Sequence, residues 1–307
     1  MREDKLRRLE RVARLYYEDG LNQEDIAAEI GVSRPFISRM LNEARDIGIV
    51  EIKVRSQVPI GTGTLEKAIS MFKLGGGYLV PDGGDDPSTN RMLGNAALDL
   101  VQELGGGRLG LGWGHVIGEL VASLERRKPA RGRITDVSPL VGNRGVPIRH
   151  YHSNENVRIV AQQTKSTGHY LHTPALAETK RELELLQATE HYREIKKEWE
   201  RLDIALVNVG NHPATPDFAS VARYGNLLTQ QRAIGRLIAY FFNAEGKIIH
   251  SDTDYAIQIP LPTLARCPNV IGICSANVSA PALHGALKTG ILTHVVAREA
   301  LMASVVL

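Results

Sequence analysis

The residues NQEDIAAEIGVSRPFISRMLNEARDIG at positions 22–48 decide the fold of the N-terminal part of the chain. Two segments with apolar residues at helical spacing lie on either side of Gly-Val-Ser at 31–33. Asn22 and Ser33 are favourable N-cap residues, and Gly31 can adopt the left-handed backbone that often ends a helix. An apolar stripe over residues 4–19 adds an earlier helix. The pattern predicts three short helices, the last two joined by a tight turn.

The last of these helices has two contrasting faces. Its apolar face carries Ile37, Met40, Leu41 and Ala44. A helix, a tight turn and a helix with an arginine-bearing polar face form the plan of a helix-turn-helix, whose second helix enters the major groove of DNA. Arginine can contact guanine, and asparagine adenine, through paired hydrogen bonds. The residues expected at bases are Arg34, Ser38, Arg39 and Asn42, with Ser33 at a phosphate. A plain three-helix packing unit with a solvated arginine face is the alternative.

The residues that follow predict a wing and then a linker. Apolar and charged residues alternate from Ile49 to Val54, which indicates a short strand beside the helices. The glycine, proline and small polar residues of SQVPIGTGT at 56–64 are typical of a linker. We therefore expect a winged helix-turn-helix DNA-binding domain at 1–56 and an effector-binding and oligomerisation domain at 57–307.

Length and composition are those of a globular protein of about two domains. Of the 307 residues, 43% are hydrophobic and 23% are charged. No apolar run reaches the ~20 residues needed to span a bilayer, and no signal-peptide stretch is found, so we expect a cytoplasmic protein with no membrane partner. Cys267 and Cys274 are too few for a disulfide framework and are interpreted as buried small residues. The net charge of +3 does not indicate a nucleic-acid partner by itself.

Beyond the linker, strand-like runs alternate with helical segments. Apolar runs lie at 76–81, 108–114, 203–210, 269–276 and 293–298. Helical patterns lie at 65–74, 115–127 and 281–289, with a long charged helix from about 176 to 200. This alternation predicts an α/β fold with a mostly parallel, doubly wound sheet covered by helices on both faces.

Three loops of the predicted sheet are rich in glycine and small polar residues. They are GLGWGHV at 110–116, NVGNHP at 208–213 and CSANVSAP at 274–281. Ligands of open parallel sheets bind beyond the carboxyl ends of the strands. A glycine-rich loop at a helix start can also hold an anion with its N–H groups, although glycines equally serve tight turns. The three loops together predict a site for a small molecule.

Further motifs carry a family resemblance over nearly the whole chain. They are DIAAEIGVSRPFISRMLNEARDIGIVEIKV, GLGWG, PLVGN, YLHTPA, IALVNVG, AIGRLIAYFFNAEG and PNVIGICSANVSAPALHGALKTG. With these motifs the chain resembles the SorC family of sugar-responsive bacterial transcription regulators. The resemblance implies a helix-turn-helix followed by an effector domain similar to sugar-phosphate isomerases and deaminases. It also implies tetramers built as dimers of dimers, and phosphorylated sugars as the usual effectors.

The chain departs from the family pattern in the expected pocket. The departures are Gly235-Arg236 for a common Gly-Asp, Ser275, Ala276 and Ser279 for a Gly-Gly pair and a phosphate-binding lysine, and His115-Val116 for threonines. An arginine only donates hydrogen bonds and suits a carboxylate or phosphate, whereas an aspartate accepts them from sugar hydroxyls. We therefore expect an effector other than a standard sugar phosphate, with an acidic metabolite as first choice and a neutral sugar or polyol as second. The expected effector contacts are Gly112, Trp113, Gly114, His115, Asn211, Arg236, Ser275, Asn277 and Ser279.

The predicted protein is a regulator with two kinds of partner, operator DNA and a small effector. Because symmetric oligomers read symmetric half-sites, we expect a homodimer or homotetramer on a partly palindromic operator. The alternative is an enzyme of sugar isomerase or deaminase type with an appended DNA-binding head, which needs a general base such as His115. No catalytic residue, cofactor or metal is expected. The histidines of HYH at 150–152 and HYLH at 169–172 have no carboxylate or cysteine at a tight zinc spacing.

Overall fold

The computed structural model describes residues 3–50, 62–145, 148–214 and 219–307. The chain divides into two compact units, Met1–Val58 and Pro59–Leu307. Among the described helices, none is long and apolar enough to cross a membrane.

The first unit contains the three short helices that the sequence predicts. They are α1 (Glu3–Tyr17), α2 (Gln23–Ile30) and α3 (Arg34–Asp46). The side chain of Asn22 caps α2 by accepting hydrogen bonds from the backbone N–H groups of Glu24 and Asp25, both at 2.9 Å. Gly31 ends α2 with a φ of 74°, in the left-handed region that glycine adopts without strain. Ser33 occupies the N-cap position of α3 but makes no side-chain capping bond within the described part of the chain.

One small core joins these helices. Its buried members are Leu9, Val12, Ala13, Ile26, Ala27, Ile37, Met40, Leu41 and Ala44. The whole predicted apolar face of α3 is therefore buried, which leaves its polar face to solvent. Of the predicted wing at 49–54, only Ile49 and Val50 are described, and both pack partly buried against this core. The remainder of the wing and most of the linker lie outside the described residues.

The second unit is built on one mixed sheet. Its order is β1 (Gly76–Val80), β9 (His294–Arg298), β8 (Asn269–Cys274), β5 (Ile204–Asn211), β2 (Gly107–Leu111), β3 (Ile134–Pro139) and β4 (Thr167–Gly168). These strands pair in parallel. A hairpin of β6 (Ala233–Leu237) and β7 (Tyr240–Asn243) adds antiparallel pairing to the carboxyl end of β5. The mostly parallel sheet agrees with the sequence-based expectation.

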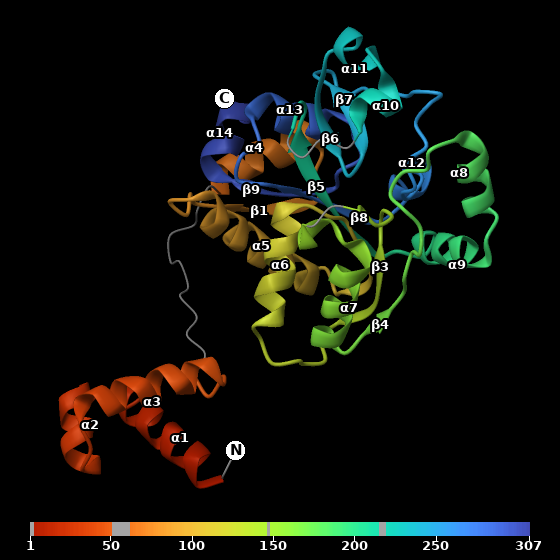
Figure 1. Cartoon of the computed structure of the whole chain (residues 1–307). Coiled ribbons are helices and arrows are strands. Elements are labelled where there is room, and N and C mark those ends of the chain that lie inside the picture. Colours follow the sequence, from red (N-terminus) through yellow and green to blue (C-terminus); the bar gives the residue numbers. More distant parts are fainter. Residues whose placement is uncertain (1–2, 51–61, 146–147, 215–218) are drawn as a thin grey trace. The chain divides into compact units, whose positions relative to one another are not determined.

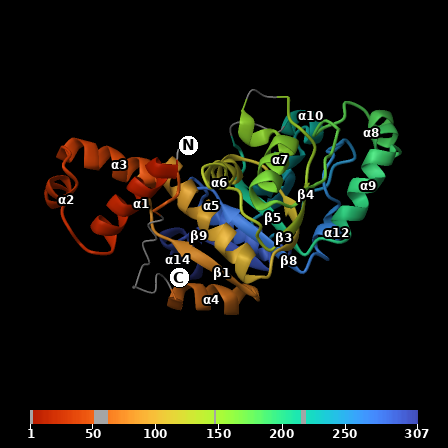
Figure 2. The same cartoon turned by 90° about the horizontal axis from the view of Figure 1, so that it is seen from below.

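Helices cover both faces of this sheet, as Figures 1 and 2 show. One face packs on α5 (Asp86–Glu103), α6 (His115–Glu125) and α7 (Ser153–Thr164). The other packs on α4 (Thr62–Phe72), α9 (Glu190–Trp199), α12 (Leu261–Leu264), α13 (Ala280–Lys288) and α14 (Glu299–Val306). Alternate residues of β5 divide between the two cores, with Ile204 in one and Ala205 in the other. The predicted doubly wound α/β fold is confirmed.

The shorter elements complete the unit and correct one expectation. They are η1 (Arg149–Tyr151), α8 (Lys180–Gln187), α10 (Ser220–Tyr224) and α11 (Leu227–Gln230). The single charged helix expected over about 176–200 is wrong, because the chain forms α8 and α9 with a break between them. Thr189 stabilises this break, since its hydroxyl caps α9 by accepting from the N–H of Tyr192 at 3.3 Å.

Both cysteines are free and buried, as the sequence indicates. Burial raises the pKa of the Cys267 thiol to about 11 and that of Cys274 to about 12. Thiols with such high pKa values are not nucleophiles at neutral pH, so both cysteines act as packing residues.

Candidate functional site

The polar face of α3 presents the side chains that the sequence places at DNA. Arg34, Arg39 and Asn42 are exposed, and Ser38 is half-buried. The Nε of Arg34 lies 3.9 Å from the Oε1 of Glu24, a weak exposed ion pair that leaves the guanidinium able to turn toward another partner. The guanidinium carbon of Arg39 lies 5.5 Å from the ring centroid of Phe36. These two contacts are loose and solvated, so the Arg34 and Arg39 side chains can reorient on contact with a nucleic acid.

The second candidate site lies at the carboxyl ends of β2 and β5. From β2 the chain continues outward to β3 and β4, whereas from β5 it continues the other way to β8 and β9. The strand order therefore reverses between β2 and β5, and such a switch point is where open α/β sheets bind ligands. A cavity of ≈ 450 Å³, called here the effector cavity, lies at this point. It is lined by Gly114, His115, Tyr151, Asn208, Gly210, Asn211, Pro213, Ala214, Arg236, Ser275 and Asn277.

The first wall of the effector cavity comes from the loop between β2 and α6. Gly114 has a φ of 105° and precedes α6, so this position favours glycine. His115 opens α6 and is exposed, with its Nδ1 3.4 Å from the Nδ1 of His150. Burial, and then the neighbouring His115, lowers the pKa of His150. The cavity therefore has an imidazole at its rim that can donate or accept a hydrogen bond.

The second wall comes from β5 and the hairpin strand beside it. Asn208 is only 7% exposed, and its buried Oδ1 accepts no hydrogen bond from the described residues. Arg236 stands opposite Gly210 in the β5–β6 register and is 8% exposed. A Cβ at Gly210 would lie 3.4 Å from the Nε of Arg236, so the glycine leaves room for the arginine. This wall combines a strong donor with a buried acceptor.

The third wall is the loop after β8, which Asn211 ties to β5. The Nδ2 of Asn211 donates to the carbonyl of Asn277 at 2.9 Å, and its Oδ1 accepts from the N–H of Ser279 at 2.9 Å. The carboxamide of Asn90 supports the same loop by accepting from the N–H of Ala276 at 2.8 Å. Side chains from β5 and α5, two elements distant in sequence, therefore hold Ser275 and Asn277 at the cavity.

The structure brings six of the nine expected effector contacts to this cavity. They are Gly114, His115, Asn211, Arg236, Ser275 and Asn277. Three others support the walls. Gly112 packs closely on β5, where a Cβ would lie 2.9 Å from the carbonyl of Leu206. Trp113 is 2% exposed and packs edge-on against Tyr151, with ring centroids 5.5 Å apart. Ser279 caps α13 by accepting from the N–H of Ala282 at 3.4 Å.

The expected effector contacts omitted five cavity residues, Tyr151, Asn208, Gly210, Pro213 and Ala214, although the loop predicted at 208–213 contains three of them. The sequence does indicate a special role for Asn208, since it is a polar residue inside the otherwise apolar run IALVNVG. No sequence pattern indicates that Tyr151 lines the cavity, because it reaches the cavity from η1 through the tertiary fold. Among the described lining residues, Arg236 carries a positive charge and none is Asp or Glu.

Comparisons with known proteins agree with this architecture. Residues 60–306 match the family described as "Putative sugar-binding domain". The chain is 27% identical over 294 residues to the sorbitol operon regulator of Klebsiella pneumoniae, with 92% of each chain covered. It is 25% identical over 291 residues to the deoxyribonucleoside regulator of Bacillus subtilis, with 90% of this chain and 89% of that protein covered. The crystal structure of the full-length sorbitol operon regulator SorC from Klebsiella pneumoniae has a TM-score of 0.75, at 25% identity and 100% coverage of both chains.

An α/β effector domain joined to a helix-turn-helix defines the class of SorC-type transcription regulators. Through the match over residues 60–306, the chain belongs to the family described above as "Putative sugar-binding domain". The family resemblance expected from the sequence is therefore confirmed.

Proposed function

We propose that this protein is a transcription regulator that binds operator DNA through α3 and changes its DNA affinity when a small polar metabolite occupies the effector cavity. The observation that carries the proposal is the combination, in one chain, of a helix with an exposed Arg and Asn face and a cavity built at a sheet switch point. The similarity to the proteins named sorbitol operon regulator and deoxyribonucleoside regulator supports it.

Base contacts are proposed for Arg34, Ser38, Arg39 and Asn42, and a phosphate contact for Ser33. The apolar side of α3 is buried, so its polar side is the face left for a groove. Loss of one bidentate base contact costs ~1–3 kcal/mol of discrimination. Selection of bound duplexes from a pool of random sequences identifies the operator for the binding measurements.

The test compares operator and scrambled duplexes for the wild type, Arg34→Ala and Arg39→Ala at one fixed salt concentration. We expect both variants to lose preference for the operator by roughly ten-fold or more. Arg14→Ala is the matched control, because Arg14 is an exposed arginine on α1 that pairs with Glu10 and Glu18. Unchanged specificity in both α3 variants would remove this helix from base reading.

The proposed effector is a small molecule with a hydroxyl or other hydrogen-bond donor and, in the first choice, an anionic group. The buried Oδ1 of Asn208 calls for a donor, and the Arg236 guanidinium suits a carboxylate through two parallel bonds. An acidic metabolite is the first choice, and a neutral sugar or polyol is the second. Thermal-shift screens of acidic, neutral and phosphorylated metabolites test this order. Micromolar binding of an ordinary sugar phosphate, undiminished in Arg236→Ala, would contradict it.

We propose a binding role rather than an enzymatic one for this cavity. An isomerase or deaminase needs a positioned general base, and the described lining offers His115 but no carboxylate. Turnover of a screened metabolite that His115→Gln abolishes would favour the enzyme instead.

A further inference from the structure

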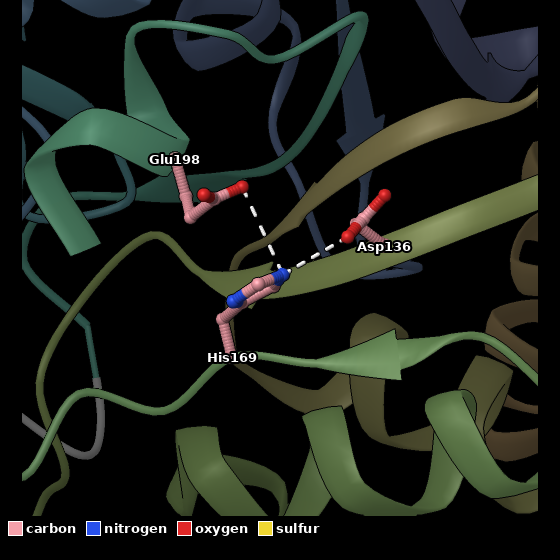
Figure 3. Close-up of side chains that lie close together, drawn as sticks. All are labelled: Asp136, His169 and Glu198. Carbon is pink, nitrogen blue, oxygen red and sulfur yellow. Dashed lines mark hydrogen bonds and ion pairs between the residues drawn. The ribbon is translucent and has the colours of Figure 1, made fainter. Parts of the chain in front are cut away.

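Three metal-ligating side chains meet at the β3–β4 edge of the sheet, and none of them lines the effector cavity. Asp136 lies on β3, His169 directly follows β4, and Glu198 lies near the end of α9 (Figure 3). One ligand atom from each side chain lies within 4.8 Å of the others. The Nε2 of His169 lies 3.0 Å from the Oδ1 of Asp136 and 3.8 Å from the Oε2 of Glu198.

Backbone pairing fixes two of these side chains relative to each other. β3 and β4 pair with Asp136 opposite Thr167, and the N–H of His169 donates to the carbonyl of Val137 at 2.8 Å. The third side chain comes from α9, which is anchored on the same edge because the indole N–H of Trp199 donates to the carbonyl of Pro139 at 2.7 Å. The cluster therefore stands on secondary structure rather than on free loops.

In each carboxylate, one oxygen lies near an arginine and the other lies near the Nε2 of His169. The Oδ2 of Asp136 lies 4.0 Å from the Nε of Arg108, and the Oε1 of Glu198 lies 3.9 Å from an Nη of Arg201. At these distances the two arginines give weak electrostatic support and no hydrogen bond. The Oδ1 of Asp136 and the Oε2 of Glu198 converge on one imidazole nitrogen (Figure 3).

A cavity of ≈ 460 Å³ gives solvent access to this cluster and supplies more potential ligands. His172, His191 and Glu194 line it together with His169 and Glu198. The rings of His172 and His191 lie 6.0 Å apart between centroids. His169 and Glu198 line this cavity, and the Asp136 side chain is itself 24% exposed, so an ion from solvent has access to the cluster and can keep water in its remaining positions.

We propose that Asp136, His169 and Glu198 bind a divalent first-row transition-metal ion, with Zn²⁺ as the first choice. One imidazole nitrogen and two carboxylate oxygens suit such an ion, with water completing a four-coordinate site. Mg²⁺ is disfavoured because it prefers oxygen ligands in octahedral geometry. The ion takes the place of the proton between His169 and Asp136 and joins α9 to β3 and to the segment after β4.

The competing arrangement is an ion-pair network without metal, in which His169 bridges the two carboxylates. The two arrangements differ in what the protein does with added metal. A metal site gives saturable binding with a defined stoichiometry and raises the unfolding temperature as the metal concentration rises, because the ion binds the folded state. An ion-pair network gives neither.

The experiment uses the full chain without an affinity tag, freed of metal by chelator and dialysis, and Zn²⁺ alone as the probe. Calorimetric titration should give one saturable site per chain that His169→Ala and Glu198→Gln each weaken by about 100-fold or more, beyond the loss seen for supporting residues. Two matched controls should bind as the wild type does. They are Glu200→Gln, an exposed glutamate two residues further along, and His250→Ala, an exposed histidine on another element.

Co²⁺ substitution tests the same site in the wild type, so the result does not depend on a variant folding. We expect visible absorption from bound Co²⁺ that Zn²⁺ abolishes and an equal concentration of Mg²⁺ leaves unchanged. No saturable Zn²⁺ binding, or binding of the same strength in His169→Ala and Glu198→Gln, would overturn the proposal. Displacement of Co²⁺ by Mg²⁺ would overturn the assigned class of ion.

Discussion

Asp254→Ala should destabilise the second unit strongly, because Asp254 neutralises a buried arginine. The guanidinium of Arg223 donates to both carboxylate oxygens of Asp254, at 2.7 and 2.9 Å, and the hydroxyl of Tyr224 donates to the same carboxylate at 2.7 Å. Arg223 is 1% exposed and Asp254 15%. Arg223 also donates to the carbonyl of Ala239 at 2.9 Å, between the strands of the hairpin that carries Arg236. The network therefore holds one wall of the effector cavity.

The magnitude follows from burial. Removal of one partner from a buried ion pair costs about 3–5 kcal/mol, because the other charge stays buried and loses the attraction of that partner. The substitution also removes the acceptor of the buried Tyr224 hydroxyl, which lowers the free energy of unfolding further. Because both effects come from the same carboxylate, they do not simply add. For a unit of this size, the loss corresponds to a fall in Tm of roughly 6–20 °C.

Tryptophan fluorescence during guanidinium unfolding measures this effect in the correct unit, because both tryptophans, Trp113 and Trp199, belong to Pro59–Leu307. Asp252→Ala is the matched control, since Asp252 is exposed and two residues away. A loss below about 1 kcal/mol in Asp254→Ala, or a loss equal to that of Asp252→Ala, would refute the reasoning, since so small an effect is typical of surface pairs.

Three further outcomes follow from the structure. Gly118→Ala should cost about 1–3 kcal/mol in the same unfolding assay, because a Cβ there overlaps the imidazole of His150; a change below roughly 0.5 kcal/mol would contradict this packing. Stability should fall as the pH drops below about 6.5, because burial lowers the pKa of His150 and of His294, so the unfolded chain takes up protons that the folded chain does not. His150→Gln should flatten this dependence and the exposed His250→Gln should not; equal slopes in both would contradict it. The full chain, and a fragment that begins at Ile60, should each sediment as a dimer or a larger oligomer, and a monomeric fragment would contradict assembly through the second unit.

Local chemistry explains what the sequence predicted well. Asn22 and Gly31 act on their own neighbours in the chain, so the ends of α2 could be read from residue type alone. The run IALVNVG is apolar throughout except for Asn208 because β5 is buried on both faces, and that pattern does not depend on which strands lie beside it. The break between α8 and α9 was missed because Ala188-Thr189 contains neither glycine nor proline.

Tertiary contacts explain what the sequence could not predict. Tyr151 reaches the effector cavity only because η1 packs beside α6, and no spacing in the sequence records that contact. Asp136, His169 and Glu198 likewise come from three separate elements, so a search for metal ligands at short spacing passes over them. Trp113 was expected as a contact and stands behind the wall, since a large apolar side chain next to a ligand loop can equally serve the core.

The central claim is that the effector cavity controls operator binding, and one measurement tests it most directly. Operator affinity is measured by fluorescence anisotropy at fixed salt, with and without the metabolite found by thermal shift, for the wild type and for Arg236→Ala. We predict that the metabolite changes the operator Kd of the wild type by roughly 5–150-fold, the usual range for coupled sites, and leaves that of Arg236→Ala unchanged. A metabolite that binds the wild type without changing operator affinity, or that acts equally on Arg236→Ala, would contradict the claim.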